Sequence, residues 1–141
     1  TIMQLGQSRE KRMTTLLAAL TLTVTVLFGN GTTTRPVRCV VDTGAMHTIL
    51  RGDQAAAIRD VIPPYAQPVT VNGIGGARNG EFRLMPTLKV EGSDLPLWRD
   101  AWIIVLHGDA TTSPYPCLLG ANVLFRQPFA VTNDGLRAFP H

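Results

Sequence analysis

The sequence predicts an all-β domain built from short strands and tight turns. From Leu20 to Val26, aliphatic and threonine residues alternate with a period of two, as a half-buried strand requires. The 13 glycines and 10 prolines among 141 residues indicate frequent turns and disfavour a helical bundle. Because this length supplies one domain with a real core, we expect a tail over residues 1–17 and a single domain over 18–141.

The first strand is expected to form a hairpin with the segment that follows it. Asn30-Gly31 favours a tight turn, because both residue types tolerate a positive φ. The second strand then runs antiparallel through Val37 to Val41. Pro36 fits near the start of that strand or on an edge, because it has no N–H to donate to the sheet.

The middle of the chain predicts one brief helix and a second hairpin. After the apolar run 48–50, Asp53 is expected to cap a helix over residues 54–58. Strands around 69–71 and 81–90 flank glycine-rich residues 72–76, which predicts a hairpin with a mobile tip.

The C-terminal part predicts three strands and one short helix. We expect a strand over 97–106, a helix over 121–126 and a last hairpin that turns at residues 133–135. Trp98 and Trp102 stand four residues apart on the first of these strands and are therefore expected on one face.

Metal, disulfide and nucleic-acid functions have little support in the sequence. Cys39 and Cys117 are the two cysteines; we expect reduced, buried thiols, with redox control of an assembly as the alternative. His47 and His107 have no metal partner at suitable spacing, so no metal and no cofactor is expected. A net charge of +3 is too small to indicate nucleic-acid binding.

The strongest membrane candidate is the apolar stretch 16–28, which threonines interrupt. It is shorter than the roughly 20 apolar residues that a helical span needs, so we expect no membrane association. A signal peptide or anchor is the alternative, because Lys11 and Arg12 precede the stretch. Those basic residues are interpreted as part of a solvated tail, with a nucleic-acid-binding arm as the alternative.

The segment with the clearest chemistry is residues 40–45, where Asp42 follows two valines and precedes Thr43, Gly44 and Ala45. A carboxylate beside apolar residues is partly desolvated and needs hydrogen-bond donors. The Thr43 hydroxyl and the next two backbone amides can supply them. On these residues alone, a structural turn after a strand is an equally good interpretation.

Three separated segments together resemble the retropepsin-like aspartic proteases of retroviruses, retrotransposons and their domesticated relatives. Residues 42–50 resemble the catalytic loop and the strand after it, 73–76 the flap tip, and 118–124 the motif that ends in the C-terminal helix. Residues 125–139 also resemble the closing hairpin of retroelement members. The resemblance implies an all-β, retropepsin-like acid protease barrel with one short C-terminal helix and one lobe per chain.

The implied reaction requires two carboxylates. Hydrolysis of an amide without a metal or a nucleophilic side chain needs a base to activate water and an acid for the leaving nitrogen. Two carboxyl groups that share one proton supply both, because like charges a few Å apart cannot both ionise. The chain has one Asp-Thr-Gly, so we expect a homodimer that brings Asp42 to Asp42 across a twofold axis.

The resemblance also implies roles for residues around Asp42. Thr43 would lock the pair of aspartates through hydroxyl hydrogen bonds to the partner subunit, and Gly44 would offer its carbonyl to the substrate. The substrate would be an extended polypeptide, plausibly the polyprotein that contains the chain, cut between hydrophobic residues in the cytoplasm or a virus-like particle. The implied substrate-binding residues are Val40, Ala45, His47, Ile49, Gly73, Ile74, Gly75, Gly76, Pro116 and Leu118.

The sequence departs from retroviral members at one ion pair. Those members place an acid after the catalytic-loop alanine and an arginine after the helix-leading glycine, where this chain has Met46 and Ala121. The loss of both charges together leaves neither one unpaired. A non-catalytic binding or dimerisation module with the same fold is the alternative function.

Overall fold

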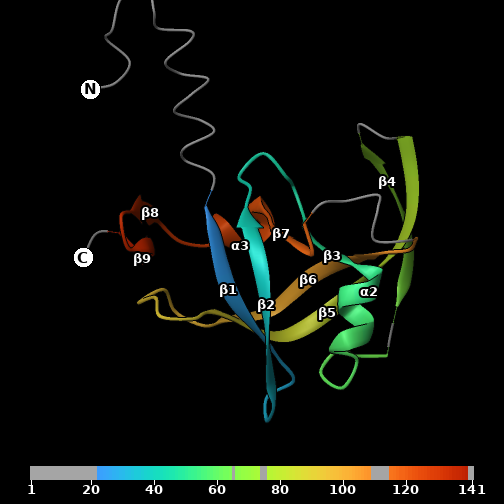
Figure 1. Cartoon of the computed structure of the whole chain (residues 1–141), viewed down its shortest axis with the longest axis horizontal. Coiled ribbons are helices and arrows are strands. Elements are labelled where there is room, and N and C mark those ends of the chain that lie inside the picture. Colours follow the sequence, from blue (N-terminus) through green and yellow to red (C-terminus); the bar gives the residue numbers. More distant parts are fainter. Residues whose placement is uncertain (1–21, 65, 74–75, 109–114, 140–141) are drawn as a thin grey trace, which may run out of the picture.

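The computed structural model describes residues 22–64, 66–73, 76–108 and 115–139, which form an all-β domain (Figure 1). The predicted tail over 1–17 lies outside the described residues. The helix near the C-terminus is short, as predicted. The elements in chain order are β1 Thr23–Gly29, β2 Thr34–Val41, β3 Thr48–Arg51, α2 Gly52–Ala57, β4 Gln67–Gly73, β5 Gly76–Val90, β6 Trp98–Leu106, β7 Cys117–Leu119, α3 Ala121–Leu124, β8 Phe129–Thr132 and β9 Gly135–Ala138.

Six strands close into a barrel in the order β1-β2-β7-β3-β6-β5, because β1 pairs with both β2 and β5. Strand β4 pairs only with β5 in the described sheet and extends as a hairpin arm from the barrel. Strands β8 and β9 form a separate hairpin on the opposite side of the barrel from that arm (Figure 1). The described strands therefore form one barrel lobe in the chain, as predicted.

The β1–β2 hairpin confirms the first predicted pairing, with Thr23 opposite Val40 and Gly29 opposite Thr34. The Asn30 side chain accepts backbone N–H bonds from Thr32 and Thr33 at 2.9 and 2.8 Å, which fixes the turn. The described part of the apolar stretch 16–28 is therefore mostly strand. Among the residues with a described position, none belongs to a helix long and apolar enough to cross a membrane.

The core fills the barrel with side chains that the period-two pattern turns inward. Phe28, Met85, Leu88, Ile103 and Leu119 are all fully buried. Each such side chain contributes roughly 1.5–3 kcal/mol relative to an exposed position. The barrel is therefore a packed interior that holds the loops at its ends in fixed positions.

The two tryptophans do not share a face, contrary to the prediction. Trp98 is 3% exposed in the core, whereas Trp102 is 40% exposed. Asp100, which lies between them, has a φ of 51°, a left-handed conformation that interrupts the alternation of an extended strand. Because of this interruption, the Trp102 side chain points away from the core, although Trp102 follows Trp98 by four residues.

The two cysteines form a disulfide, so the expectation of reduced thiols was wrong. Val40 lies beside Leu118 in the parallel β2–β7 pair, which places the preceding residues, Cys39 and Cys117, side by side. Their Cα atoms are 4.4 Å apart, within the range for a disulfide. The two cysteines are 78 residues apart, so the sequence alone did not show that they lie close together.

The helix after β3 begins earlier than predicted. Helix α2 starts at Gly52, so Asp53 lies in its first turn and Arg51 is the capping position. The Asp53 carboxylate accepts the Gln54 N–H at 3.0 Å and also binds the Arg51 guanidinium. An acidic residue stabilises the first turn of a helix without being its cap, which explains the shifted start.

Candidate active site

Asp42 stands at the end of β2, where main-chain bonds from two neighbouring segments fix the backbone. The Asp42 N–H donates to the Leu119 carbonyl of β7 at 3.0 Å, and the Val41 N–H donates to the Leu22 carbonyl at 2.8 Å. Asp42 is partly buried as a residue, whereas Thr43 and Gly44 are exposed. The barrel thus presents one carboxylate at the end of a fixed strand.

The loop after Asp42 folds back on that carboxylate. The Gly44 N–H donates to Asp42 Oδ1 at 3.0 Å, as the sequence predicted for this amide. The Ala45 N–H donates instead to the Asp42 main-chain carbonyl at 3.2 Å, which closes a turn. One predicted amide donor therefore holds the carboxylate, while the other holds the backbone.

Helix α3 clamps the far side of this loop. The Ala121 N–H donates to the Ala45 carbonyl at 2.8 Å, and the Asn122 N–H donates to the Met46 carbonyl at 3.2 Å. Gly120 precedes the helix and lies so close to the His47 carbonyl that an added Cβ would overlap it. Only glycine therefore permits this approach between α3 and the loop.

Asn122 is a supporting residue that the sequence interpretation missed. The Thr48 backbone N–H and hydroxyl both donate to Asn122 Oδ1 at 2.9 Å, and the Gly120 N–H donates to the Thr48 hydroxyl at 3.0 Å. The Asn122 amide donates to the Trp102 carbonyl at 2.8 Å. Thr48 is fully buried, so this network satisfies polar groups that otherwise carry a desolvation cost.

Three of the residues expected to bind substrate lie side by side. Leu118 pairs with Val40 of β2 on one side and with Ile49 of β3 on the other, which places the three side chains on one face of the sheet. Pro116 precedes this group and accepts the Arg51 N–H through its carbonyl at 3.0 Å. The barrel thus gathers an apolar surface beside the Asp42 loop.

The predicted flap corresponds to the end of the β4–β5 hairpin. Gly73 pairs with Gly76, and Gly76 has a φ of +100°, a conformation that favours glycine. Ile74 and Gly75, which the sequence placed at the tip, lie outside the described residues.

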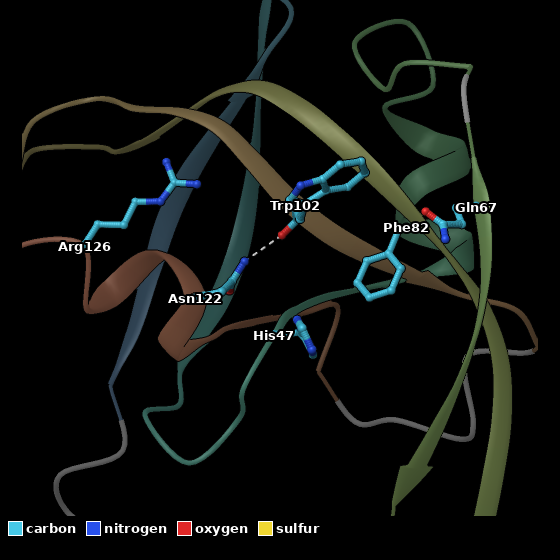
Figure 2. A pocket seen from close by; sticks show the side chains of 6 residues that line it. All are labelled: His47, Gln67, Phe82, Trp102, Asn122 and Arg126. Carbon is cyan, nitrogen blue, oxygen red and sulfur yellow. Dashed lines mark hydrogen bonds between the residues drawn. The ribbon is translucent and has the colours of Figure 1, made fainter.

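A cavity of about 390 Å³ opens between the Asp42 loop and the base of the β4–β5 arm (Figure 2). Of its lining, only His47 was among the predicted site residues. The other side chains come from β4, β5, β6 and the α3 region, so only closure of the barrel brings them together. The lining residues are His47, Gln67, Phe82, Trp102, Asn122 and Arg126.

The clearest electrostatic pairing near the site lies on its periphery. The side-chain hydrogen bond from Arg51 lowers the pKa of the Asp53 carboxyl and raises that of Arg51, because each stabilises the charged form of the other. Within the described ranges, no three His, Cys, Asp or Glu side chains gather as a metal site would require.

Comparison with known proteins gives a structural match without a sequence match. No protein-family model and no curated protein matches the sequence. A crystal structure of a retropepsin-like aspartic protease from Rickettsia conorii is similar, with a TM-score of 0.57 over 82% of this chain and 88% of that chain. The chain has the retropepsin-like fold. At 18% identity, the likeness to the Rickettsia conorii protein is one of fold.

Within the retropepsin-like fold, the chain carries one Asp-Thr-Gly loop, at residues 42–44. The Asp42 loop, the α3 clamp and the β4–β5 arm all belong to this one lobe.

Proposed function

We propose that the protein is an aspartic endopeptidase that acts as a homodimer on extended polypeptides. The observation that carries this proposal is the partly buried Asp42 at the end of β2 in a retropepsin-like barrel. Its carboxylate accepts the Gly44 N–H, and its main-chain N–H donates to the Leu119 carbonyl of β7. The Gly44 hydrogen bond alone would also fit a simple turn, so the retropepsin-like barrel around this Asp-Thr-Gly loop is what favours acid–base catalysis.

The proposed reaction uses Asp42 from each of two chains. The ionised carboxylate removes a proton from a water molecule, whose oxygen then forms a bond to the peptide carbonyl carbon. The protonated carboxyl of the partner subunit donates a hydrogen bond to the carbonyl oxygen as negative charge develops there. A carboxyl group next protonates the leaving nitrogen as the C–N bond breaks, which restores one shared proton.

An exposed apolar surface beside the Asp42 loop supports docking of a second copy. Met46 is 77% exposed and Phe125, just after α3, is 63% exposed. Phe129 stacks on Phe125 with ring centroids 6.0 Å apart. Met46 stands where retroviral members carry the acid of their ion pair, and these exposed apolar side chains favour an apolar dimer contact close to the site that the second chain would complete.

The apolar face beside the loop supports an extended polypeptide as substrate. Ile49 and Leu118, which are partly exposed, offer apolar contacts for substrate side chains, and the buried Val40 supports Leu118 from the next strand. The β4–β5 arm has the geometry to cover a peptide that binds as an added strand. Thr43 would hold the aspartate pair across the dimer, and the Gly44 carbonyl would accept a substrate N–H. The polyprotein that contains this chain is our proposed natural substrate.

The decisive experiment compares the wild type with Asp42→Asn on a peptide library across pH. We expect cleavage by the wild type and none by the variant, which keeps the shape of the side chain but cannot act as a base. Asp60→Asn is the matched control, since Asp60 forms an exposed ion pair with Arg35 and should leave cleavage unchanged. Cleavage that survives Asp42→Asn excludes the proposed mechanism.

The dimer has its own test. Specific activity should fall on dilution as the dimer dissociates, and Met46→Asp should shift the loss to higher protein concentration because it places like charges together at the contact. A wild-type chain that dimerises but cleaves no peptide would instead favour the non-catalytic dimerisation module.

A further inference from the structure

The cavity between the Asp42 loop and the β4–β5 arm has walls made largely of aromatic rings. Phe82 contacts the His47 ring edge to face, with centroids 5.5 Å apart, and the Trp102 ring in the same manner at 6.1 Å. Figure 2 shows the three rings around one end of the cavity, next to Gln67. Aromatic rings in this arrangement attract a further ring beyond the effect of buried area alone.

The position of the cavity identifies which part of a polypeptide can reach it. His47 lies on the same loop as Asp42, while Gln67 and Phe82 are directly paired at the base of the β4–β5 arm. None of residues 42–45 lines the cavity. A side chain that enters it therefore belongs to a residue beyond the two that flank the bond cut at Asp42.

The charge at the other end of the cavity restricts its occupant further. Arg126 donates to the main-chain carbonyls of Arg99 and Asp100, the latter at 2.8 Å, which holds a positive charge at the α3 end (Figure 2). A fixed guanidinium opposes the entry of lysine or arginine, which the ring faces would otherwise attract. A neutral aromatic side chain gains from the rings and is not opposed by the charge, whereas an aliphatic or acidic side chain lacks the ring contact.

We propose that this cavity is a specificity subsite for an aromatic side chain of the polypeptide and that Trp102 is its main determinant. The proposal rests on the proposed function only in requiring that the Asp42 loop binds a polypeptide. A volume of about 390 Å³ accommodates one large ring. Trp102 leaves 40% of its surface exposed in the free chain, and a bound ring would cover it.

The two tryptophans allow a direct binding test. In the full-length Asp42→Asn chain, the two indole N–H signals in an NMR spectrum report the buried Trp98 and the cavity-lining Trp102. Peptides that differ at one position, with tyrosine, leucine or lysine, serve as probes. The Trp102 signal should shift with the tyrosine peptide and hardly with the lysine peptide, while the Trp98 signal stays in place.

A cleavage assay tests the same subsite through selectivity. At one substrate position, the wild type should prefer tyrosine over leucine in kcat/KM by up to about tenfold, the range expected for an aromatic pair. Trp102→Ala should reduce that preference to within about twofold. Trp102→Phe should retain most of it, and Leu97→Ala, at an exposed residue outside the cavity, should leave it unchanged.

The outcomes separate this proposal from the proposed function. If the wild type cleaves peptides but Trp102→Ala keeps the same preferences, the subsite proposal is wrong and the proposed protease function is supported. If no peptide is cleaved but the tyrosine peptide shifts the Trp102 signal and not the Trp98 signal, the subsite proposal is supported and the proposed protease function is rejected. Equal shifts with all three peptides, or no Trp102 shift with any of them, overturn the subsite.

Discussion

The Asp42 loop and the aromatic cavity lie next to each other but are held by different kinds of contact. The loop is held by main-chain hydrogen bonds to β7 and α3, which a shift of the loop would break. Three of the six side chains that line the cavity are rings that touch edge to face, and a ring can be exchanged without moving a strand. In the proposed protease, the difference means that substitutions in the cavity can change specificity while the hydrogen bonds that position Asp42 stay in place.

The largest expected effect on stability comes from removing the disulfide that joins β2 to β7. The Cys39–Cys117 bond spans 78 residues, and closure of a loop of that length stabilises by up to about 4 kcal/mol. Cys39→Ala with Cys117→Ala should lower the free energy of unfolding by about 3–4 kcal/mol in urea denaturation. The wild type in reductant is the matched comparison, and a double variant as stable as the oxidised wild type contradicts the bond.

Gly120→Ala tests the close approach of α3 to the loop. The new Cβ would overlap the His47 carbonyl, which belongs to the backbone and cannot rotate away, so we expect a loss of about 3 kcal/mol. Thermal unfolding measures this loss. Gly92→Asn is the control, because Gly92 has a φ of +74° with nothing within 4 Å and asparagine tolerates that conformation. Equal losses of stability in the two variants would contradict the close contact between Gly120 and the His47 carbonyl.

Asn122→Ala should have an intermediate effect. It removes the acceptor of two Thr48 hydrogen bonds and leaves buried donors unpaired, at a cost of about 2 kcal/mol. Activity should fall more than stability alone explains, because Thr48 and Gly120 link the loop to the barrel. Trp102→Ala, which leaves its main-chain carbonyl in place, should lower stability less, and the reverse order would contradict the comparison above.

The smallest effect is expected at the Arg51–Asp53 pair. Arg51 lowers the folded-state pKa of Asp53 below its ordinary value of 3.8, so the ionised carboxylate stabilises the folded state above that pH. The contribution is lost as pH falls through the lowered value. The difference in melting temperature between wild type and Asp53→Asn should therefore stay constant from neutral pH to about 5 and vanish in more acidic solution; a difference that grows on acidification would reverse the assignment.

Features that depend on residues close in sequence were predictable, whereas those that depend on barrel closure were not. The alternation up to Val26 and the Asn30-Gly31 turn define a hairpin locally, and the Asp42 loop follows from its own short motif. Trp102 lies on the cavity wall because Asp100 has a positive φ. Aspartate tolerates this conformation, but an aspartate in the sequence does not by itself predict it. The Cys39–Cys117 pair depends on a parallel register between distant strands, which no local pattern encodes.

Strand β2 has a consequence for solubility. Strand β7 covers only its last two residues, 40 and 41, so the N-terminal half of β2 has a described partner on one side only, at β1. Pro36 lies in this half without an N–H to offer, and Arg35 and Arg38 are exposed beside it. Proline and exposed charged side chains on an open strand discourage pairing with the strand of another molecule, so this half of β2 is a poor template for edge-to-edge association.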